Sequence, residues 1–95
     1  MNRNTKMLAY PIVIRKDTNG SLLVTFPDVP EAATSAYDST QALRVARDAL
    51  ESALGFYFED GRAIPMPSAP KPGQKMIALT QRIRAKIIRH NNTKH

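Results

Sequence analysis

Eight carboxylates are the residues of this chain best placed to act together in chemistry, because all of them lie between Asp17 and Asp60. Clustered carboxylates hold the two Mg²⁺ ions of many enzymes that cleave phosphodiesters. Such a site needs acids from several elements converging on one point, yet the β-type run of residues 7–15 contains none. The long helix predicted downstream carries only Asp48 and Glu51 before its terminal Glu59 and Asp60. The pattern therefore predicts a solvated acidic surface and no metal site.

Other residue types that support catalysis are scarce. The chain has no Cys, which excludes disulfides and thiolate chemistry. Its two histidines, His90 and His95, lie in a basic tail with no neighbouring carboxylate, and we expect both to be exposed. The four glycines are scattered and form no phosphate-binding loop. The sequence predicts neither an enzyme nor a cofactor.

Charge divides the chain into two parts of opposite sign. The stretch from Asp17 to Asp60 holds eight acids against Arg44 and Arg47 alone, a net charge of about −6, although the whole chain carries +6. No acid follows Asp60. Because charge steers association, the middle is expected to meet a basic partner and the tail a phosphate-rich or acidic one.

The charge argument selects two sets of candidate residues. The acids expected to face a basic partner are Asp28, Glu31, Asp38, Asp48 and Glu51. The bases that would contact nucleic acid, as non-specific phosphate ligands, are Arg82, Arg84, Lys86 and Arg89.

The hydrophobic pattern predicts a single α+β unit, a small antiparallel sheet packed on one long helix. Residues 7–15 and 22–26 read as strands joined by a turn at Asn19 and Gly20, and a short third strand is expected near residues 32–36. Pro11 cannot donate to a ladder, which favours an edge position or the start of pairing for the first strand.

The helix predicted next is capped by Asp38 or Ser39 and ends at Gly61. Its apolar stripe is Ala42, Val45, Ala46, Ala49, Leu50, Ala53, Leu54 and Tyr57. A Pro-rich connector over residues 64–73, a short strand over 75–80 and a basic helix over 81–90 complete the chain. We divide it into residues 1–68, the main domain, and residues 69–95, the connector with the C-terminal strand and basic helix.

Two further features bear on partners and location. Phe56, Tyr57 and Phe58 are expected to pack in the core and between subunits, or else to anchor a protein partner. The polar start resembles no signal peptide and no apolar run is long enough to cross a membrane, so a cytoplasmic location is expected.

Five segments in order resemble the HicB antitoxin family. They are Tyr10-Pro11-Ile12-Val13-Ile14, then Val24-Thr25-Phe26-Pro27-Asp28-Val29-Pro30-Glu31-Ala32, the helix start with Thr40 and Ala42, then Phe56-Tyr57-Phe58-Glu59-Asp60-Gly61, and Ile64-Pro65-Met66-Pro67-Ser68. The likeness is close over residues 7–68 and looser over residues 75–91.

The resemblance implies a partial RNase H-like fold without nuclease activity. It implies an antitoxin of a type II toxin–antitoxin system that occludes HicA, a small basic mRNA-cleaving toxin, and that assembles as dimers or tetramers. The candidate acids would then be toxin-binding residues.

The chain departs from the family at its C-terminus, where it is expected to lack the usual C-terminal DNA-binding domain, since only one basic helix follows the connector. The alternative is a solitary HicB-like protein that binds nucleic acid, with weak DNA binding, or regulates transcription.

Overall fold

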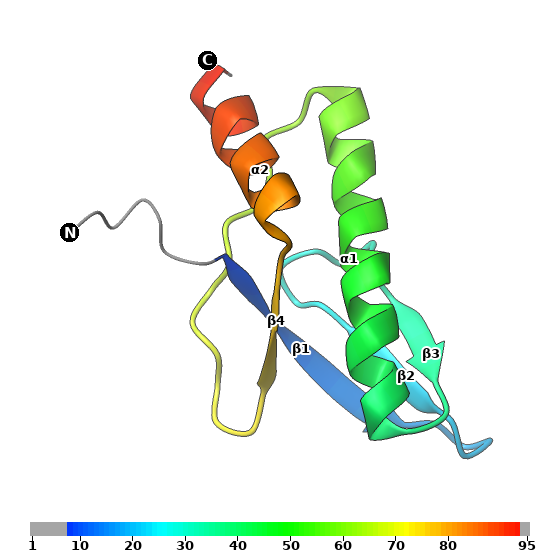
Figure 1. Ribbon diagram of the computed structural model, residues 1–95. Coiled ribbons are helices and arrows are strands. Elements are labelled where there is room, and N and C mark those ends of the chain that lie inside the picture. The colour runs from blue at the N-terminus through cyan, green and yellow to red at the C-terminus, as the bar shows by residue number, and fades with distance from the viewer. Residues whose placement is uncertain (1–7, 94–95) are drawn as a thin grey trace.

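A computed structural model describes residues 8–93. Met7 of the predicted first strand and His95 lie outside the described residues. The elements follow in the order β1 (Ala9–Lys16), β2 (Leu22–Thr25), β3 (Thr34–Ala36), α1 (Ser39–Asp60), β4 (Lys75–Ala78) and α2 (Gln81–Thr93). The strands form one antiparallel sheet in the order β3-β2-β1-β4. α1 crosses one face of this sheet, and α2 lies beside the C-terminal half of α1 (Figure 1). The predicted α+β class and its element order are confirmed.

β1 lies between β2 and β4, so an edge strand, the first alternative expected from Pro11, was wrong, whereas the second, a place at the start of pairing, agrees with the register because pairing with β2 begins only at Val13. Residues 9–12 of β1 pair with β4, and residues 13–16 pair with β2. The Leu79 N–H donates to the Leu8 carbonyl over 3.1 Å, and bonded pairs alternate along an antiparallel ladder. Pro11 therefore occupies a non-bonded position opposite β4, where a missing N–H removes no ladder hydrogen bond.

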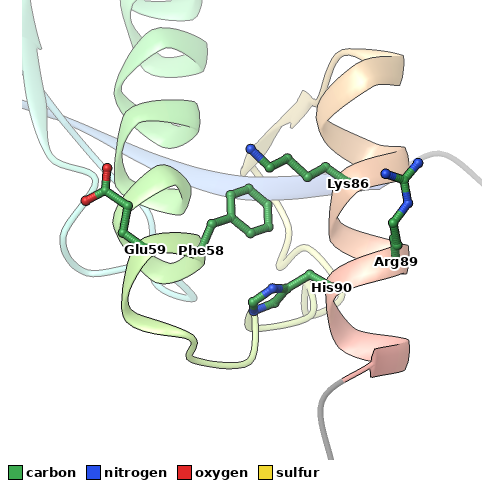
Figure 2. A pocket seen from close by; sticks show the side chains of 5 residues that line it. All are labelled: Phe58, Glu59, Lys86, Arg89 and His90. Carbon is green, nitrogen blue, oxygen red and sulfur yellow. The ribbon is translucent and has the colours of Figure 1, made fainter.

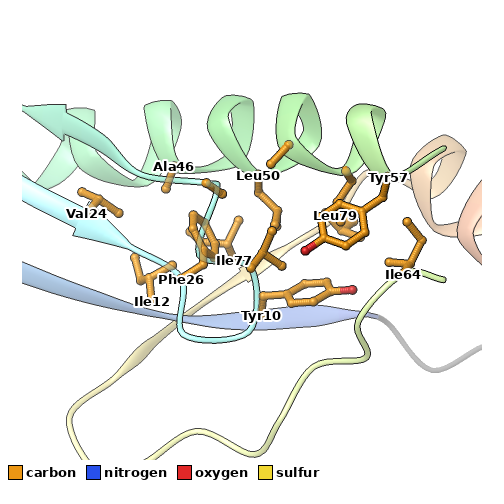
Figure 3. Close-up of a cluster of buried hydrophobic side chains, with 14 of the residues drawn as sticks. Tyr10, Ile12, Val24, Phe26, Ala46, Leu50, Tyr57, Ile64, Ile77 and Leu79 are labelled. Atoms are coloured by element: carbon orange, nitrogen blue, oxygen red, sulfur yellow. The ribbon is translucent and has the colours of Figure 1, made fainter. Parts of the chain in front are cut away.

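The hydrophobic core lies between the sheet and α1 (Figure 3). Alternate strand residues such as Tyr10, Ile12, Val24 and Ile77 point to it, as the period of two requires. The expected stripe of α1 is buried at Ala42, Ala46, Leu50, Ala53, Leu54 and Tyr57, while Val45 and Ala49 are half-buried. Ile87 of α2 is also buried, so the C-terminal helix shares this core.

Both ends of α1 are capped. The Asp38 carboxylate accepts from the Gln41 N–H over 2.8 Å, and Gly61 ends the helix at φ 69°, donating to the Phe58 carbonyl. The Gln41 side chain accepts from the N–H of Tyr37, one residue before the cap, over 2.7 Å. These contacts fix where the helix begins and ends.

The remaining predictions differ only at element ends. β2 stops at Thr25, β3 is three residues long, β4 stops at Ala78 and α2 continues to Thr93. Residues 64–73 contain no helix or strand. Among the described residues, no helix combines the length and apolar character that a membrane span requires.

Candidate interaction surfaces

Asp28 ties the loop after β2 to the Pro-rich connector. Its half-buried carboxylate accepts from the Ser68 N–H over 2.9 Å and from the Ser68 hydroxyl over 3.1 Å. Nearby, the Tyr10 hydroxyl donates to the Pro65 carbonyl over 2.7 Å. Burial raises the pKa of Tyr10 to about 12, with the Asp28 charge adding to the effect. Asp28 therefore has an internal structural role as well as a negative charge.

Glu31 lies in a cluster at the C-terminal end of α1. Its carboxylate accepts from the Tyr57 hydroxyl over 2.9 Å and lies 3.7 Å from the Arg62 guanidinium. Arg62 stacks 4.0 Å from the centroid of the Tyr57 ring and lies 3.6 Å from Asp60. The backbone N–H of Glu31 lowers the pKa of its carboxyl most, followed by the hydrogen bond from Tyr57. Burial raises the pKa of the Tyr57 hydroxyl most, and its hydrogen bond to Glu31 raises this pKa further.

The end of α1 carries charge of the sign that a helix C-terminus disfavours. Glu59 and Asp60 occupy the last turn, which contains no basic residue. The helix dipole favours cations there. Arg62 follows directly and pairs with Asp60, but both partners remain about half exposed or more, at 49% and 62%. A cationic partner would meet this end of the helix favourably.

The other candidate acids lie along α1. Asp38 caps its start, and Glu51 accepts from the Thr80 N–H over 3.3 Å, joining α1 to the start of α2. Asp48 is exposed, and no hydrogen bond or ion pair engages its side chain within residues 8–93.

The five acids therefore do not form one cluster. α1 has 22 residues, which corresponds to about 33 Å. Asp28 and Glu31 lie near one end of this length, Asp38 lies at the other, and Asp48 and Glu51 lie between them.

The four candidate bases of α2 separate onto two sides of the helix. Arg82, Lys86 and Arg89 follow at spacings of four and three, which places them on one flank. Arg84 is two residues from Arg82, about 200° around the helix, and lies on the other flank. The Lys86 ammonium lies 4.7 Å from the centroid of the Phe58 ring, so the first flank faces the end of α1.

A groove of ≈ 500 Å³ lies between the two helices, lined by Phe58, Glu59, Lys86, Arg89 and His90 (Figure 2). The rings of Phe58 and His90 meet edge to face at 5.2 Å. His90 Nε2 donates to the Arg62 carbonyl over 2.7 Å. His90 is half-buried, so the expectation that it is exposed was wrong.

Sequence reasoning named Tyr57 and Phe58 only as aromatic packing residues and His90 only as an exposed tail residue, and it gave Tyr10 and Arg62 no part in these surfaces. The one signal in the sequence was Arg62, a lone base directly after an acidic helix end. The expected aromatic cluster divides: Tyr57 is buried, Phe58 is half-buried and Phe56 is 61% exposed. Within the described residues, no three Asp, Glu or His side chains are grouped closely enough to hold a metal ion.

Comparison with known proteins relates the chain to antitoxins. Residues 9–88 match the family described as HicB_like antitoxin of bacterial toxin-antitoxin system. Antitoxin HicB 2 of Photorhabdus laumondii subsp. laumondii is 40% identical over 84 residues, covering 88% of this chain and 58% of that protein. Antitoxin HicB of Escherichia coli K12 is 33% identical over 81 residues, covering 85% of this chain and 59% of that protein. The chain thus spans a little over half the length of these relatives.

The fold also has a solved counterpart. The crystal structure of the N-terminal domain of Burkholderia pseudomallei antitoxin HicB superposes with a TM-score of 0.58 at 21% identity, covering 76% of this chain and 95% of that one. This likeness extends to the fold alone. Together with the match over residues 9–88, the relatives establish that the chain belongs to the HicB-like antitoxin family.

Proposed function

We propose that this protein is the antitoxin of a toxin–antitoxin pair and that it binds a small, basic, RNA-cleaving toxin of the HicA type. The observation that carries the proposal is the family match over residues 9–88, supported by relatives named as antitoxins. The chain spans only part of those relatives, and we propose that it also binds a toxin.

The mechanism is occlusion of the toxin's RNA-binding face. An RNA-cleaving protein presents cations to phosphates, and carboxylates on a rigid scaffold compete for the same cations. The candidate acids Asp28, Glu31, Asp38, Asp48 and Glu51 are the proposed toxin-facing residues. Four of them are held by hydrogen bonds to Ser68, Tyr57, Gln41 and Thr80, which limits the side-chain entropy lost on binding.

The helix end strengthens this surface. Glu59 and Asp60 are negative charges at the end of α1 where the helix dipole is also negative. A toxin Lys or Arg placed there would neutralise both the carboxylates and the carbonyl end of the helix. An arrangement of charge that is unfavourable for the helix itself is typical of a binding site. The protein acts by binding, without catalysing a reaction, and we propose that it does so as a dimer or tetramer.

The proposal is tested by expressing a small basic toxin of the HicA type with and without this chain. Expressed alone, that protein should arrest growth, and co-expression of the present chain should restore it. Purified together, the two proteins should form a complex whose association slows as salt rises, because screening weakens charge steering. Failure to restore growth, with no complex at low salt, would leave the solitary HicB-like regulator as the better description.

The charge argument is tested with Asp48→Lys combined with Glu59→Lys. Both side chains are exposed, so the double variant should fold normally and associate with the toxin at least tenfold more slowly at low salt. The matched control is Asp17→Lys in the β1–β2 turn, which changes charge at one position outside the candidate set. Equal effects per charge reversed would show that net charge alone, and not this surface, governs association.

A further inference from the structure

We propose that the groove between α1 and α2 binds single-stranded nucleic acid, with a base against Phe58 and His90 and the phosphates along Arg82, Lys86 and Arg89. This inference goes beyond the antitoxin role and does not depend on a toxin. It rests on the juxtaposition of two aromatic rings with one basic helix flank (Figure 2).

The basic flank supplies the phosphate contacts. Arg82, Lys86 and Arg89 follow one another along a single side of α2, about 10 Å from first to last. No acid lies on α2 to neutralise them. A row of cations beside a groove follows a nucleic-acid backbone and gains affinity through release of counterions.

The aromatic rings supply the base contact. Phe58 extends from α1 toward α2. The centroids of the Phe58 and His90 rings are 5.2 Å apart in an edge-to-face arrangement, and the Lys86 ammonium lies 4.7 Å from the Phe58 centroid. The bond from His90 to the Arg62 carbonyl fixes the imidazole in place. Rings held next to cations form the platform on which unpaired bases stack, since every base has a π-face.

The geometry favours a single strand over a duplex. A helix that reads a duplex must enter the major groove, which is about 12 Å wide and admits one α-helix. Here α1 lies alongside α2 (Figure 1), and Lys86 of the basic flank lies over the Phe58 ring of α1. A paired base could not reach Phe58, whereas an unpaired base could.

One lining residue provides an internal check. Glu59 is the one acid among the residues that line the groove. If phosphates occupy the groove, this carboxylate repels them, and Glu59→Gln should tighten binding. A groove filled by a cationic or apolar ligand would respond in the opposite way or not at all.

The test measures fluorescence anisotropy of labelled 12-nucleotide strands, oligo-dT and oligo-U, with the full chain at 50 mM salt. We expect both strands to bind. Comparing their affinities shows whether the groove prefers DNA or RNA. Phe58→Leu, and separately Lys86→Gln with Arg89→Gln, should each weaken binding roughly tenfold. The second variant should also flatten the salt slope, by roughly 0.7 for each phosphate that is no longer neutralised. Glu59→Gln should bind more tightly.

Two controls separate this site from general attraction of polyanions. Arg84→Gln removes one positive charge from the opposite flank and should change affinity less than twofold. An abasic strand with the same number of phosphates, and a duplex of the same length, should bind about tenfold more weakly than oligo-dT.

Equal affinity for the abasic strand, an equal loss in Arg84→Gln, or no binding by the unaltered chain would overturn the inference. Circular dichroism verifies folding of each variant. If Phe58→Leu fails to fold, the abasic strand still tests the base contact with the unaltered protein.

Discussion

The Tyr57 hydroxyl donates a 2.9 Å hydrogen bond to the Glu31 carboxylate, joining residues that are 26 positions apart in the chain. Arg62 closes the arrangement from the other side, 3.7 Å from Glu31 and 4.0 Å from the Tyr57 ring. The loop after β2 is thereby held to the C-terminal end of α1. The same carboxylate is both a candidate toxin contact and a structural anchor.

Glu31 should make stability depend on pH on the acid side. The fold lowers the pKa of this carboxyl below its ordinary 4.5, so the unfolded chain binds the proton more readily. The stabilisation is therefore present above pH 4.5 and lost as pH falls through the folded value. Urea midpoints measured from pH 7 to pH 3 should decrease, and should decrease less in Glu31→Gln. Identical pH profiles for the two proteins would contradict this prediction.

Tyr10 should act on the alkaline side, in the opposite sense. Its pKa rises from 10.0 to about 12, so the folded protein retains a proton that the unfolded chain loses near pH 10. The stabilisation is present below pH 10 and is lost between pH 10 and 12. Tyr10→Phe should lower stability at pH 7 by about 1 kcal/mol, because the Pro65 carbonyl loses its donor. The variant should also lose less stability than the parent over that alkaline range.

Two glycines of α1 and its cap should respond to alanine in opposite directions. Gly61 has φ 69°, where a Cβ is strained, so Gly61→Ala should cost about 1 kcal/mol of unfolding free energy. Gly55 lies within the helix, and a Cβ there meets nothing within 4 Å. Gly55→Ala should therefore stabilise the protein by about 0.5–1 kcal/mol. Thermal unfolding of both variants checks the pair, and a shared sign would refute the argument.

Two substitutions at Asp38 separate its role as the cap of α1 from the effect of its negative charge. Asp38→Ala removes the acceptor for the Gln41 N–H and should cost about 1 kcal/mol. Asp38→Ser keeps an acceptor while removing the charge, so its stability should remain near that of the parent. If Asp38 also contacts a toxin, the serine variant should bind more slowly despite normal stability. Unchanged association in Asp38→Ser would restrict this residue to capping.

The chain should unfold in one transition despite the division into residues 1–68 and 69–95. β4 pairs with β1, and Ile87 of α2 is buried in the common core. Tyr10 and Tyr57 report on that core by fluorescence above the signal of the exposed Tyr37, and the chain has no Trp, while circular dichroism reports on the helices. Coincident denaturant midpoints are expected. Separated midpoints would indicate that the two segments are independent units.

Local signals in the sequence were sufficient for the elements and their order. The three- and four-residue spacing of α1, its Asp38 cap and its Gly61 end are properties of neighbouring residues, and all three were confirmed. The prediction of an edge strand from Pro11 was wrong, because a missing N–H prevents a hydrogen bond on only one side of a strand and at only one position. Which side that is depends on register with β4, which begins more than sixty residues later.

The interaction surfaces were less accessible from sequence because they depend on distant pairs. Net charge identified the acidic and basic stretches, but charge counts do not show that Asp28 binds Ser68 or that Glu31 binds Tyr57. Nor does composition place Phe58 beside Lys86, since that contact requires α2 to pack against the end of α1. The roles of the selected acids and bases in binding partners stay predictions.

The divided pairing of β1 has a consequence for synthesis on the ribosome. When the chain has emerged only as far as α1, β2 can already pair with residues 13–16 of β1 and β3 with β2, while residues 9–12 of β1 have no neighbour. That open strand edge persists until the connector and β4 have been translated. An open edge invites pairing with other chains, so the interval before β4 emerges is when this nascent protein is most exposed to aggregation.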